Sequence, residues 1–264
     1  TLTAVRLLIA ALVLLTVLKV SGRSLSMTPA ALRLYAVIGV LGNTVPFCLI
    51  SLGEVYITSS MAAVLMGIMP ISTFVLAHLF IPSEPMTQRK LLGVVLGFAG
   101  LLSLVGMSAL GALGSHPAGQ LAVLGGALCY SLSAVYTRTH NVAGGLEAAC
   151  GVGIVAALTC LPLALLMEDP WSMQPDRGAL VSIITLGIFH TAVASLIYFR
   201  TIRSLGAVVF AQINYLIPVL GSLWGILLLN EAFGWQIVLA LGLVLCGVYF
   251  VQPKRRHKPV STAS

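Results

Sequence analysis

The sequence predicts an all-α integral membrane protein, from its composition and from apolar runs that recur along the whole chain. Of its 264 residues, 59% are hydrophobic and 8% are charged, whereas about 25% of the residues of a typical soluble domain are charged. An apolar helix needs about 20 residues to cross roughly 30 Å of hydrocarbon, and runs of this length follow one another with short loops between them. We therefore expect most of the chain to lie in a lipid bilayer.

Nine apolar runs are long enough to be predicted as membrane spans. Each is bounded by polar, charged, glycine or proline residues, which are typical of loops. The predicted spans lie near residues 2–20, 33–50, 58–81, 90–108, 119–138, 148–167, 179–199, 206–229 and 234–251.

The short loops carry a signal for orientation, because loops rich in Lys and Arg stay in the cytoplasm. Alternate loops and the C-terminal tail hold nearly all the cations, namely Lys19, Arg23, Arg33, Arg89, Lys90, Arg138, Arg200, Arg203 and those of residues 254–258. The other loops hold Arg177, beside Glu168, Asp169 and Asp176. This asymmetry predicts a multi-pass protein of a bacterial inner (plasma) membrane with its C-terminus in the cytoplasm.

Several classes of function are disfavoured by what the chain contains. The cations behind the net charge of +7 sit singly or in small groups between apolar runs, which is typical of topology signals rather than of a nucleic-acid interface. The five cysteines show no paired spacing of the metal or redox kind, so no metal and no cofactor is predicted. Catalytic residues are not predicted either, because the predicted spans contain no central carboxylate and no known hydrolase or metalloprotease motif.

An internal repeat relates the two parts of the chain at an offset of about 148 residues. Residues 63–70 align with residues 211–218, so that Pro70 falls on Pro218, and one deleted residue then carries Gly100 onto Gly247. The matched spans are five apart, so they cross the membrane in opposite directions and the repeat is inverted. Inverted repeats are typical of secondary transporters, which bind their substrate between the two halves.

The repeat defines the expected domain organisation. The first half-repeat is residues 1–108 and the second is residues 118–252, followed by a basic cytoplasmic tail over 253–264. The span at 119–138 opens the second half and has no counterpart in the first. We therefore expect two inverted five-helix repeats with ten spans in the full protein, of which nine are present here and the first is missing.

A set of short motifs at matching places in the two halves carries a family resemblance. They are Ala4-Val5-Arg6 at the start of a span, residues 57–63 running to Pro70, Glu84 followed by Gly93, Gly97 and Gly100, and Pro218, Glu231, Gly242 and Gly247. With these motifs the chain resembles an EamA-type transporter of the drug/metabolite transporter superfamily over nearly its whole length. The resemblance implies ten helices in two inverted halves around a central cavity. Ile81-Pro82-Ser83 departs from the small or acidic residues more often found before this glutamate.

Candidate site residues are the polar and adaptable side chains near the middle of spans, where a polar group is costly unless it faces the interior. The predicted substrate-binding residues are Asn43, Met66, Tyr130, His190, Tyr198, Asn214 and Tyr215. Among them, His190 is suited to proton exchange, because an imidazole changes its charge near neutral pH. Pro70 and Pro218 are predicted as kinks or hinges, because proline removes a backbone hydrogen bond and opens the helix before it.

Each of these residues also has a purely structural interpretation, which the sequence leaves open. Small residues beside Tyr130 permit close helix packing, His190 can donate an interhelical hydrogen bond, and a proline kink need not move. Glu84 stands before a helix, where a negative charge caps the N-terminus. Arg6 can attract a carboxylate or extend to lipid headgroups.

The sequence therefore predicts a secondary transporter that exports a small metabolite, an amino acid or an amphiphilic compound, across the inner membrane. Its expected partners are this small-molecule substrate and the lipid bilayer, and a homodimer is left open. An intramembrane enzyme and a structural membrane subunit stay as alternatives, although polar faces in the middle of spans and inverted symmetry favour transport.

Overall fold

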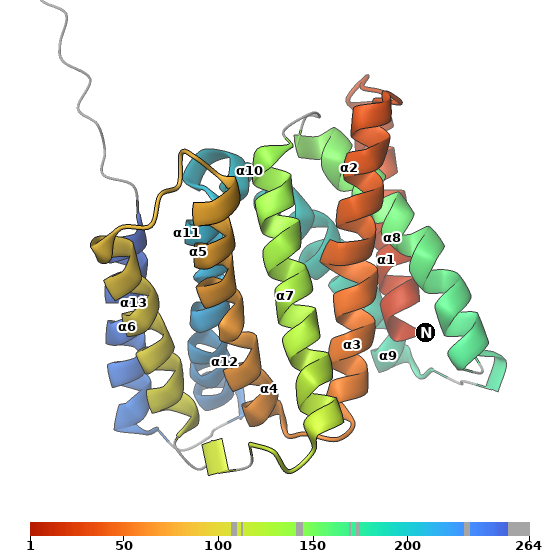
Figure 1. The fold of residues 1–264 in the computed structure, drawn as a ribbon. Helices are drawn as coiled ribbons and strands as arrows, with labels where there is room; N and C mark the ends of the chain where they lie inside the picture. Colours follow the sequence, from red (N-terminus) through yellow and green to blue (C-terminus); the bar gives the residue numbers. More distant parts are fainter. Residues whose placement is uncertain are drawn as a thin grey trace, which may run out of the picture.

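The structure is a computed structural model, which describes residues 1–106, 110–111, 113–140, 145–168, 170–172, 175–229 and 233–252. Helices make up nearly all of this part of the chain (Figure 1). In the first half they are α1 (Leu2–Val20), α2 (Pro29–Gly39), η1 (Val40–Thr44), α3 (Val45–Glu54), α4 (Ser59–Met66), α5 (Ile68–Phe80) and α6 (Gln88–Val105). In the second half they are α7 (Pro117–Thr139), α8 (Gly145–Met167), η3 (Pro170–Ser172), α9 (Arg177–Thr185), η4 (Leu186–Val193), α10 (Ala194–Leu205), α11 (Ala207–Ala211), α12 (Ile213–Leu229) and α13 (Trp235–Val251).

Eight helical stretches in the described residues are long and apolar enough to cross a membrane. They are Leu2–Val20, Pro29–Glu54, Ser59–Phe80, Gln88–Val105, Pro117–Thr139, Gly145–Met167, Arg177–Leu205 and Ala207–Leu228. The ninth predicted span is a shorter apolar helix, Trp235–Val251. Large apolar side chains cover the outside of the bundle, as with Leu166 at 83% exposed and Leu227 at 70%, which suits a surface that faces lipid rather than water.

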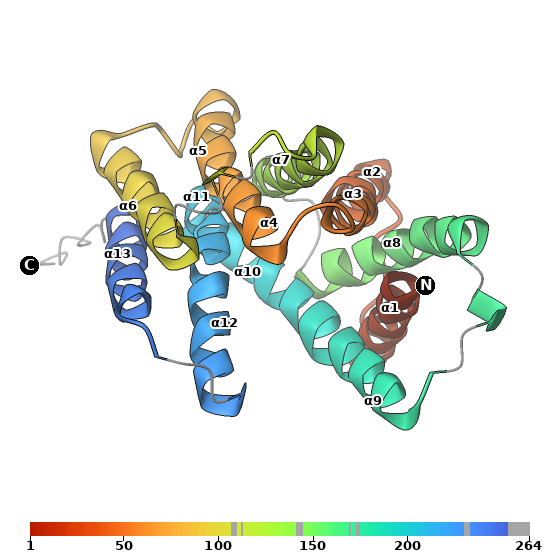
Figure 2. The same cartoon turned by 90° about the horizontal axis from the view of Figure 1, so that it is seen from below.

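The helices run side by side, with α6 and α13 at one edge of the bundle, α7 near its centre, and α1 and α8 toward the opposite edge (Figure 1). Seen from below, α12 and the α9–α10 stretch splay apart from each other (Figure 2). The end of the bundle at the top of Figure 1 carries the ends of α1, α7 and α10 and the start of α6. The predicted clustering of cations is therefore seen in space, because Lys19, Arg89, Lys90, Arg138 and Arg203 belong to these helix ends.

Glycines let α6 and α13 approach each other closely. A Cβ added at Gly93 would lie 2.6 Å from the carbonyl oxygen of Gly247, and one added at Gly100 would lie 3.0 Å from that of Ala240. These two contacts are exchanged by an offset of 147 residues, since Gly93 then maps onto Ala240 and Gly100 onto Gly247. Gly93 and Gly100 therefore serve close packing of these two helices.

Two spans are interrupted by π-helical turns at matching positions. These are η1, Val40–Thr44, within Pro29–Glu54, and η4, Leu186–Val193, within Arg177–Leu205. π-Helical turns are rare and occur frequently at functional sites. The offset of 148 residues places Asn43 of the first on Thr191 of the second.

Two other spans have one-residue breaks, close to the prolines predicted as kinks. The turn at Gly67 separates α4 from α5 three residues before Pro70, and the turn at Gln212 separates α11 from α12 six residues before Pro218. Pro218 itself lies inside the continuous helix α12. Whether either proline acts as a hinge stays a prediction.

Some sequence expectations need correction or fall outside the described residues. A glycine in an apolar span suggests close packing against another helix, but Gly221 is exposed and a Cβ added there meets nothing within 4 Å. Glu231, residues 107–109 and the tail 253–264 lie outside the described residues. The helices also begin or end several residues beyond the predicted spans, as at Pro29–Glu54 against 33–50.

Candidate functional site

A cavity of about 600 Å³ lies between the two π-helical spans, a size within the range of small-molecule sites. It is lined by Ile38, Gly42, Asn43, Phe47, Ile50, Met66, Met69, Tyr130, Ser133, Val152, His190, Thr191, Ala194, Ser195, Ile197, Tyr198, Phe199, Phe210, Ile213, Asn214 and Ile217. Six of the seven predicted site residues are in this lining: Asn43, Met66, Tyr130, His190, Tyr198 and Asn214. Residues from both halves of the chain thus form one apolar chamber with a few polar groups.

The two π-helical turns present matching polar side chains to the cavity. Asn43 donates from Nδ2 to the carbonyl oxygen of Ile38 at 3.4 Å, and Thr191 donates from Oγ1 to that of Leu186 at 3.1 Å. Each side chain thus donates to the carbonyl oxygen of the residue five positions earlier. An offset of 148 residues maps the bond of Asn43 onto that of Thr191. Among the described residues no donor binds the side-chain oxygen of Asn43, so this oxygen is available to a solute.

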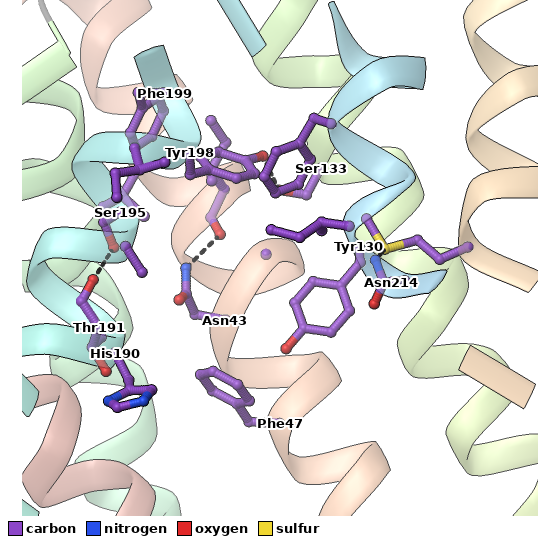
Figure 3. A pocket seen from close by; sticks show the side chains of 18 of the residues that line it. Asn43, Phe47, Tyr130, Ser133, His190, Thr191, Ser195, Tyr198, Phe199 and Asn214 are labelled. Carbon is purple, nitrogen blue, oxygen red and sulfur yellow. Dashed lines mark hydrogen bonds between the residues drawn. The ribbon is translucent and has the colours of Figure 1, made fainter. Parts of the chain in front are cut away.

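His190 lies one residue before Thr191 and is an exposed side chain of the cavity wall. In Figure 3 its imidazole lies near Phe47, at the opposite end of the view from Tyr198. The structure gives it no hydrogen-bond partner among the described residues, so the interhelical hydrogen bond considered from the sequence is not formed. Both of its ring nitrogens are therefore available for hydrogen bonds with a solute.

Helix α7 uses its small and polar stripe in two different ways. At one end, Gly119 and Gly126 pack against α3, where added Cβ atoms would meet the carbonyl oxygen of Gly53 at 3.1 Å and Ile50 Cγ1 at 2.8 Å. Further along, Tyr130 and Ser133 line the cavity. One part of the stripe therefore serves helix packing and another part lines the cavity, and substrate binding by Tyr130 stays a prediction.

Asn214 and Met66 bring the two interrupted helices of the third and eighth predicted spans to the cavity. Asn214 Nδ2 lies 2.7 Å from the sulfur of Met69 and 3.4 Å from the carbonyl oxygen of Ala211. Figure 3 shows this amide beside the ring of Tyr130. Methionine is flexible and polarisable, so this wall can adapt to apolar groups of different shape.

Tyr198 closes the cavity toward the cation-rich end. Its hydroxyl lies 2.9 Å from Thr137 Oγ1 and 3.4 Å from Ser133 Oγ on α7. Its ring meets Phe199 and Phe210 edge to face, with centroid distances of 5.0 and 4.9 Å. Aromatic contacts of this kind fix the ring, and the contact with Thr137 places it on the side of the cavity toward that end of the bundle.

An ion pair between Glu84 and Arg138 forms a second closure at the cation-rich end of the bundle, beyond Tyr198. Arg138 donates from Nε to Glu84 Oε1 at 3.0 Å, and from Nη1 to the carbonyl oxygens of Ile202 and Arg203. Glu84 also accepts hydrogen bonds from the backbone N–H groups of Ala207 and Val208 at 3.1 and 3.2 Å. The pair therefore joins the α5–α6 loop, α7 and the α10–α11 link.

The capping role expected of Glu84 is correct in kind but assigned to the wrong helix. The helix that follows it, α6, is capped by Thr87, whose side chain accepts from the N–H of Lys90. Glu84 caps α11, more than 120 residues away. Sequence reasoning sees only neighbours along the chain, so it assigned the cap locally.

Tyr215 lies away from the cavity that holds the other six predicted residues. It is fully buried, packs against Leu101, Val219 and Val244, and donates its hydroxyl to the carbonyl oxygen of Gly67 at 3.1 Å. Trp224, on the same helix, does not line the cavity and is 59% exposed. Helix α12 turns Tyr215 toward α6 and Trp224 toward the outside. Of Asn214, Tyr215 and Trp224, only Asn214 therefore faces the cavity.

The family comes from a comparison with known proteins. A family model described as the EamA-like transporter family matches residues 1–106 and 117–252. The chain belongs to the EamA-like transporter family. It is therefore a multi-pass membrane transporter rather than an enzyme, as the resemblance of its motifs to this family indicated.

Individual EamA-like relatives cover most of the chain. It is 26% identical over 255 residues to the uncharacterized transporter YoaV of Bacillus subtilis, covering 94% of this chain and 85% of that protein. An uncharacterized transporter of Archaeoglobus fulgidus is 28% identical over 231 residues, covering 83% and 76%. A solved structure titled only as the crystal structure of a protein matches with a TM-score of 0.82 at 20% identity, over 94% and 85% of the two chains. That last match supports the fold alone.

The apolar part of the lining was missed by sequence reasoning. Phe47, Ile50, Ile213 and Ile217 all contribute to the cavity wall. In an EamA-like chain an apolar residue suits lipid, a helix interface and an apolar cavity equally well. No signal in a single sequence separates these three environments.

Proposed function

We propose that this EamA-like protein is a secondary transporter that exports an amino acid or a small amphiphilic compound through the cavity between η1 and η4. The observation that carries the proposal is an apolar chamber of about 600 Å³ with Asn43 and Thr191 at matching places on its two sides. A substrate site near the middle of the membrane, between related halves, is typical of secondary transporters. The apolar lining suits an apolar side chain, and the amide oxygens suit an ammonium group.

The relation between the halves is part of the proposal. The exchanged contacts of Gly93 and Gly100, and the exchanged hydrogen bonds of Asn43 and Thr191, support two inverted five-helix repeats. In this relation α7, which packs against α3 and α5, has no counterpart in the first half among the described helices, and the place for one is beside α10 and α12. Ile197 on α10 and Leu220 on α12 are exposed, and none of the residues of the adjoining helix α9 is buried, so we propose that a further helix of the full protein covers this surface.

The orientation is tested with cysteines placed at the two ends of the bundle. We propose that the cation-rich end faces the cytoplasm of a bacterium. In a variant without native cysteines, a membrane-impermeant thiol reagent applied to intact cells should label Glu54→Cys and leave Ser24→Cys unlabelled until the membrane is opened. The reverse labelling contradicts this orientation.

Transport is tested by flux into proteoliposomes of labelled leucine and of labelled tetraphenylphosphonium, an amphiphilic cation, with and without a pH gradient. Saturable flux of either solute is the expected result. His190→Ala should reduce the flux several-fold because it removes a polar group from the cavity wall. His116→Ala, at an exposed position outside the lining, is the matched control.

Each outcome of this experiment has a separate meaning. Absence of flux for every probe from folded wild-type protein contradicts the proposed substrate class. Equal loss of flux in both histidine variants contradicts a specific role for His190. Loss of the pH-gradient effect in His190→Ala alone supports proton exchange at this residue.

A further inference from the structure

Arg6 is a cation held against the cavity wall with no acidic partner. It lies on the second turn of α1, between the buried residues Ala4 and Leu7. Its guanidinium lies over the ring of Phe47, 4.6 Å from the centroid. No carboxylate in the described part of the chain lies within 4.0 Å of it, and its Nε is buried without a hydrogen-bond partner.

The backbone at Arg6 is fixed close to the cavity. A Cβ added at Gly187 on η4 would lie 3.2 Å from the carbonyl oxygen of Arg6, so α1 packs directly on the π-helical span that carries His190. Phe47 lies between Arg6 and the cavity, which it lines. Its ring meets Tyr130 edge to face, with a centroid distance of 6.4 Å, and the Tyr130 hydroxyl points toward Phe47 (Figure 3).

We propose that Arg6 binds the carboxylate of the transported solute, with Phe47 as a side chain that turns aside to admit it. A charge in an apolar wall is costly without compensation, and a guanidinium has a planar set of donors that matches a carboxylate. With Arg6 for the carboxylate and the amide oxygens of Asn43 and Asn214 for an ammonium group, the cavity suits a zwitterion better than a lipophilic cation. This inference rests on the proposed function and narrows its substrate class.

The first test compares a solute that has a carboxylate with one that lacks it. Competition with labelled leucine uptake into proteoliposomes is measured for leucine and for leucinamide, in wild type, Arg6→Gln and Arg6→Lys. We expect wild type to prefer leucine, and Arg6→Gln to lose roughly ten- to hundred-fold of that preference, the factor given by a charge-assisted hydrogen bond. Arg6→Lys, which keeps the charge but not the planar donors, should lie between them.

Two controls distinguish a contact with the solute from a general effect of charge and from a contact with lipid. Arg177→Gln removes an exposed cation from the cation-poor end of the bundle, the end at which α1 also begins, and should leave the preference unchanged. Because a lipid phosphate offers similar anionic oxygens, the measurement is repeated in vesicles of phosphatidylcholine alone and with phosphatidylglycerol added. An effect of Arg6→Gln that depends on the lipid and not on the solute overturns the inference in favour of a headgroup contact.

The remaining outcomes are also decisive. An unchanged leucine preference in folded Arg6→Gln overturns the role of Arg6 and leaves the proposed transport intact. Equal competition by leucine and leucinamide in the wild type does the same. Absence of flux for every probe in the wild type overturns the proposed transport and this inference with it. If Arg6→Gln does not fold, Arg6→Lys with a reduced preference supports the inference, and Arg6→Lys with an unchanged one overturns it.

Discussion

The two ends of the cavity are built around two arginines in opposite situations. Arg138, at the cation-rich end, has Glu84 and two backbone carbonyls as partners. Arg6, toward the other end, has an aromatic ring beside it and no acidic partner among the described residues. The first arginine has its charge paired and joins three segments, so it closes the bundle. The second is left with free donors, which suits binding.

The largest effect on stability is expected from breaking the ion pair of Glu84 and Arg138. Glu84→Ala leaves Arg138 without its carboxylate and α11 without its cap, and Arg138→Met leaves Glu84 partly buried without a counter-charge. Removing one partner of such a pair costs about 3 kcal/mol, so both variants should unfold at markedly lower temperature in detergent. Arg200→Gln, an exposed cation at the same end, is the control and should change little.

Exchanging the two charges should not repair this end of the bundle. The double variant Glu84→Arg with Arg138→Glu restores a pair of opposite charges, but an arginine at 84 faces the N–H donors of Ala207 and Val208. A cation at a helix N-terminus is unfavourable. Full recovery of the melting temperature would show that the ion pair alone matters.

A smaller effect is expected at Gly206, beside the same glutamate. Its φ is +96°, and an added Cβ would lie 2.5 Å from Glu84 Oε1. Gly206→Ala should therefore cost about 1–3 kcal/mol, measured by thermal unfolding. Gly22→Ala shares the positive φ, at +66°, but its Cβ meets nothing within 4 Å; an equal loss in both variants would attribute the effect to the backbone and not to Glu84.

Tyr198→Phe tests the closure of the cavity by Tyr198, and its effect on stability should be intermediate to small. It removes the hydroxyl that meets Thr137 and Ser133 and keeps the ring contacts with Phe199 and Phe210. We expect a loss of stability of about 1 kcal/mol, with flux changed more than stability. A flux equal to that of wild type would exclude these hydrogen bonds from the closure.

The smallest effect on stability is expected at Arg6, which sharpens the contrast with Arg138. Removing a charge that has no acidic partner costs little stability and relieves the desolvation of that charge. Arg6→Met should therefore melt within a few degrees of wild type or slightly above it. A large loss of stability, comparable with that of Arg138→Met, would show that Arg6 is a structural residue.

Local patterns predicted the helices and most polar residues of the cavity, since spans, loop charges and mid-span polar groups are properties of short segments. Asn43, Tyr130, His190 and Asn214 were found in this way. Tyr215 was misplaced because a helical period identifies a face without identifying the neighbour that the face meets. The Glu84 cap on α11 and the contact of Arg6 with Phe47 depend on distant segments, so a single sequence contains no signal for them.

The π-helical turn within Pro29–Glu54 also changes the phase of that span. In an ideal α-helix Gly39 and Gly53 would be roughly four turns apart and on the same side. In the structure Gly39 meets Val155 of α8, whereas Gly53 meets Gly119 and Val123 of α7. One additional residue in a turn rotates everything after it by about 100°, so a single span serves as the packing partner of two helices that lie in different directions.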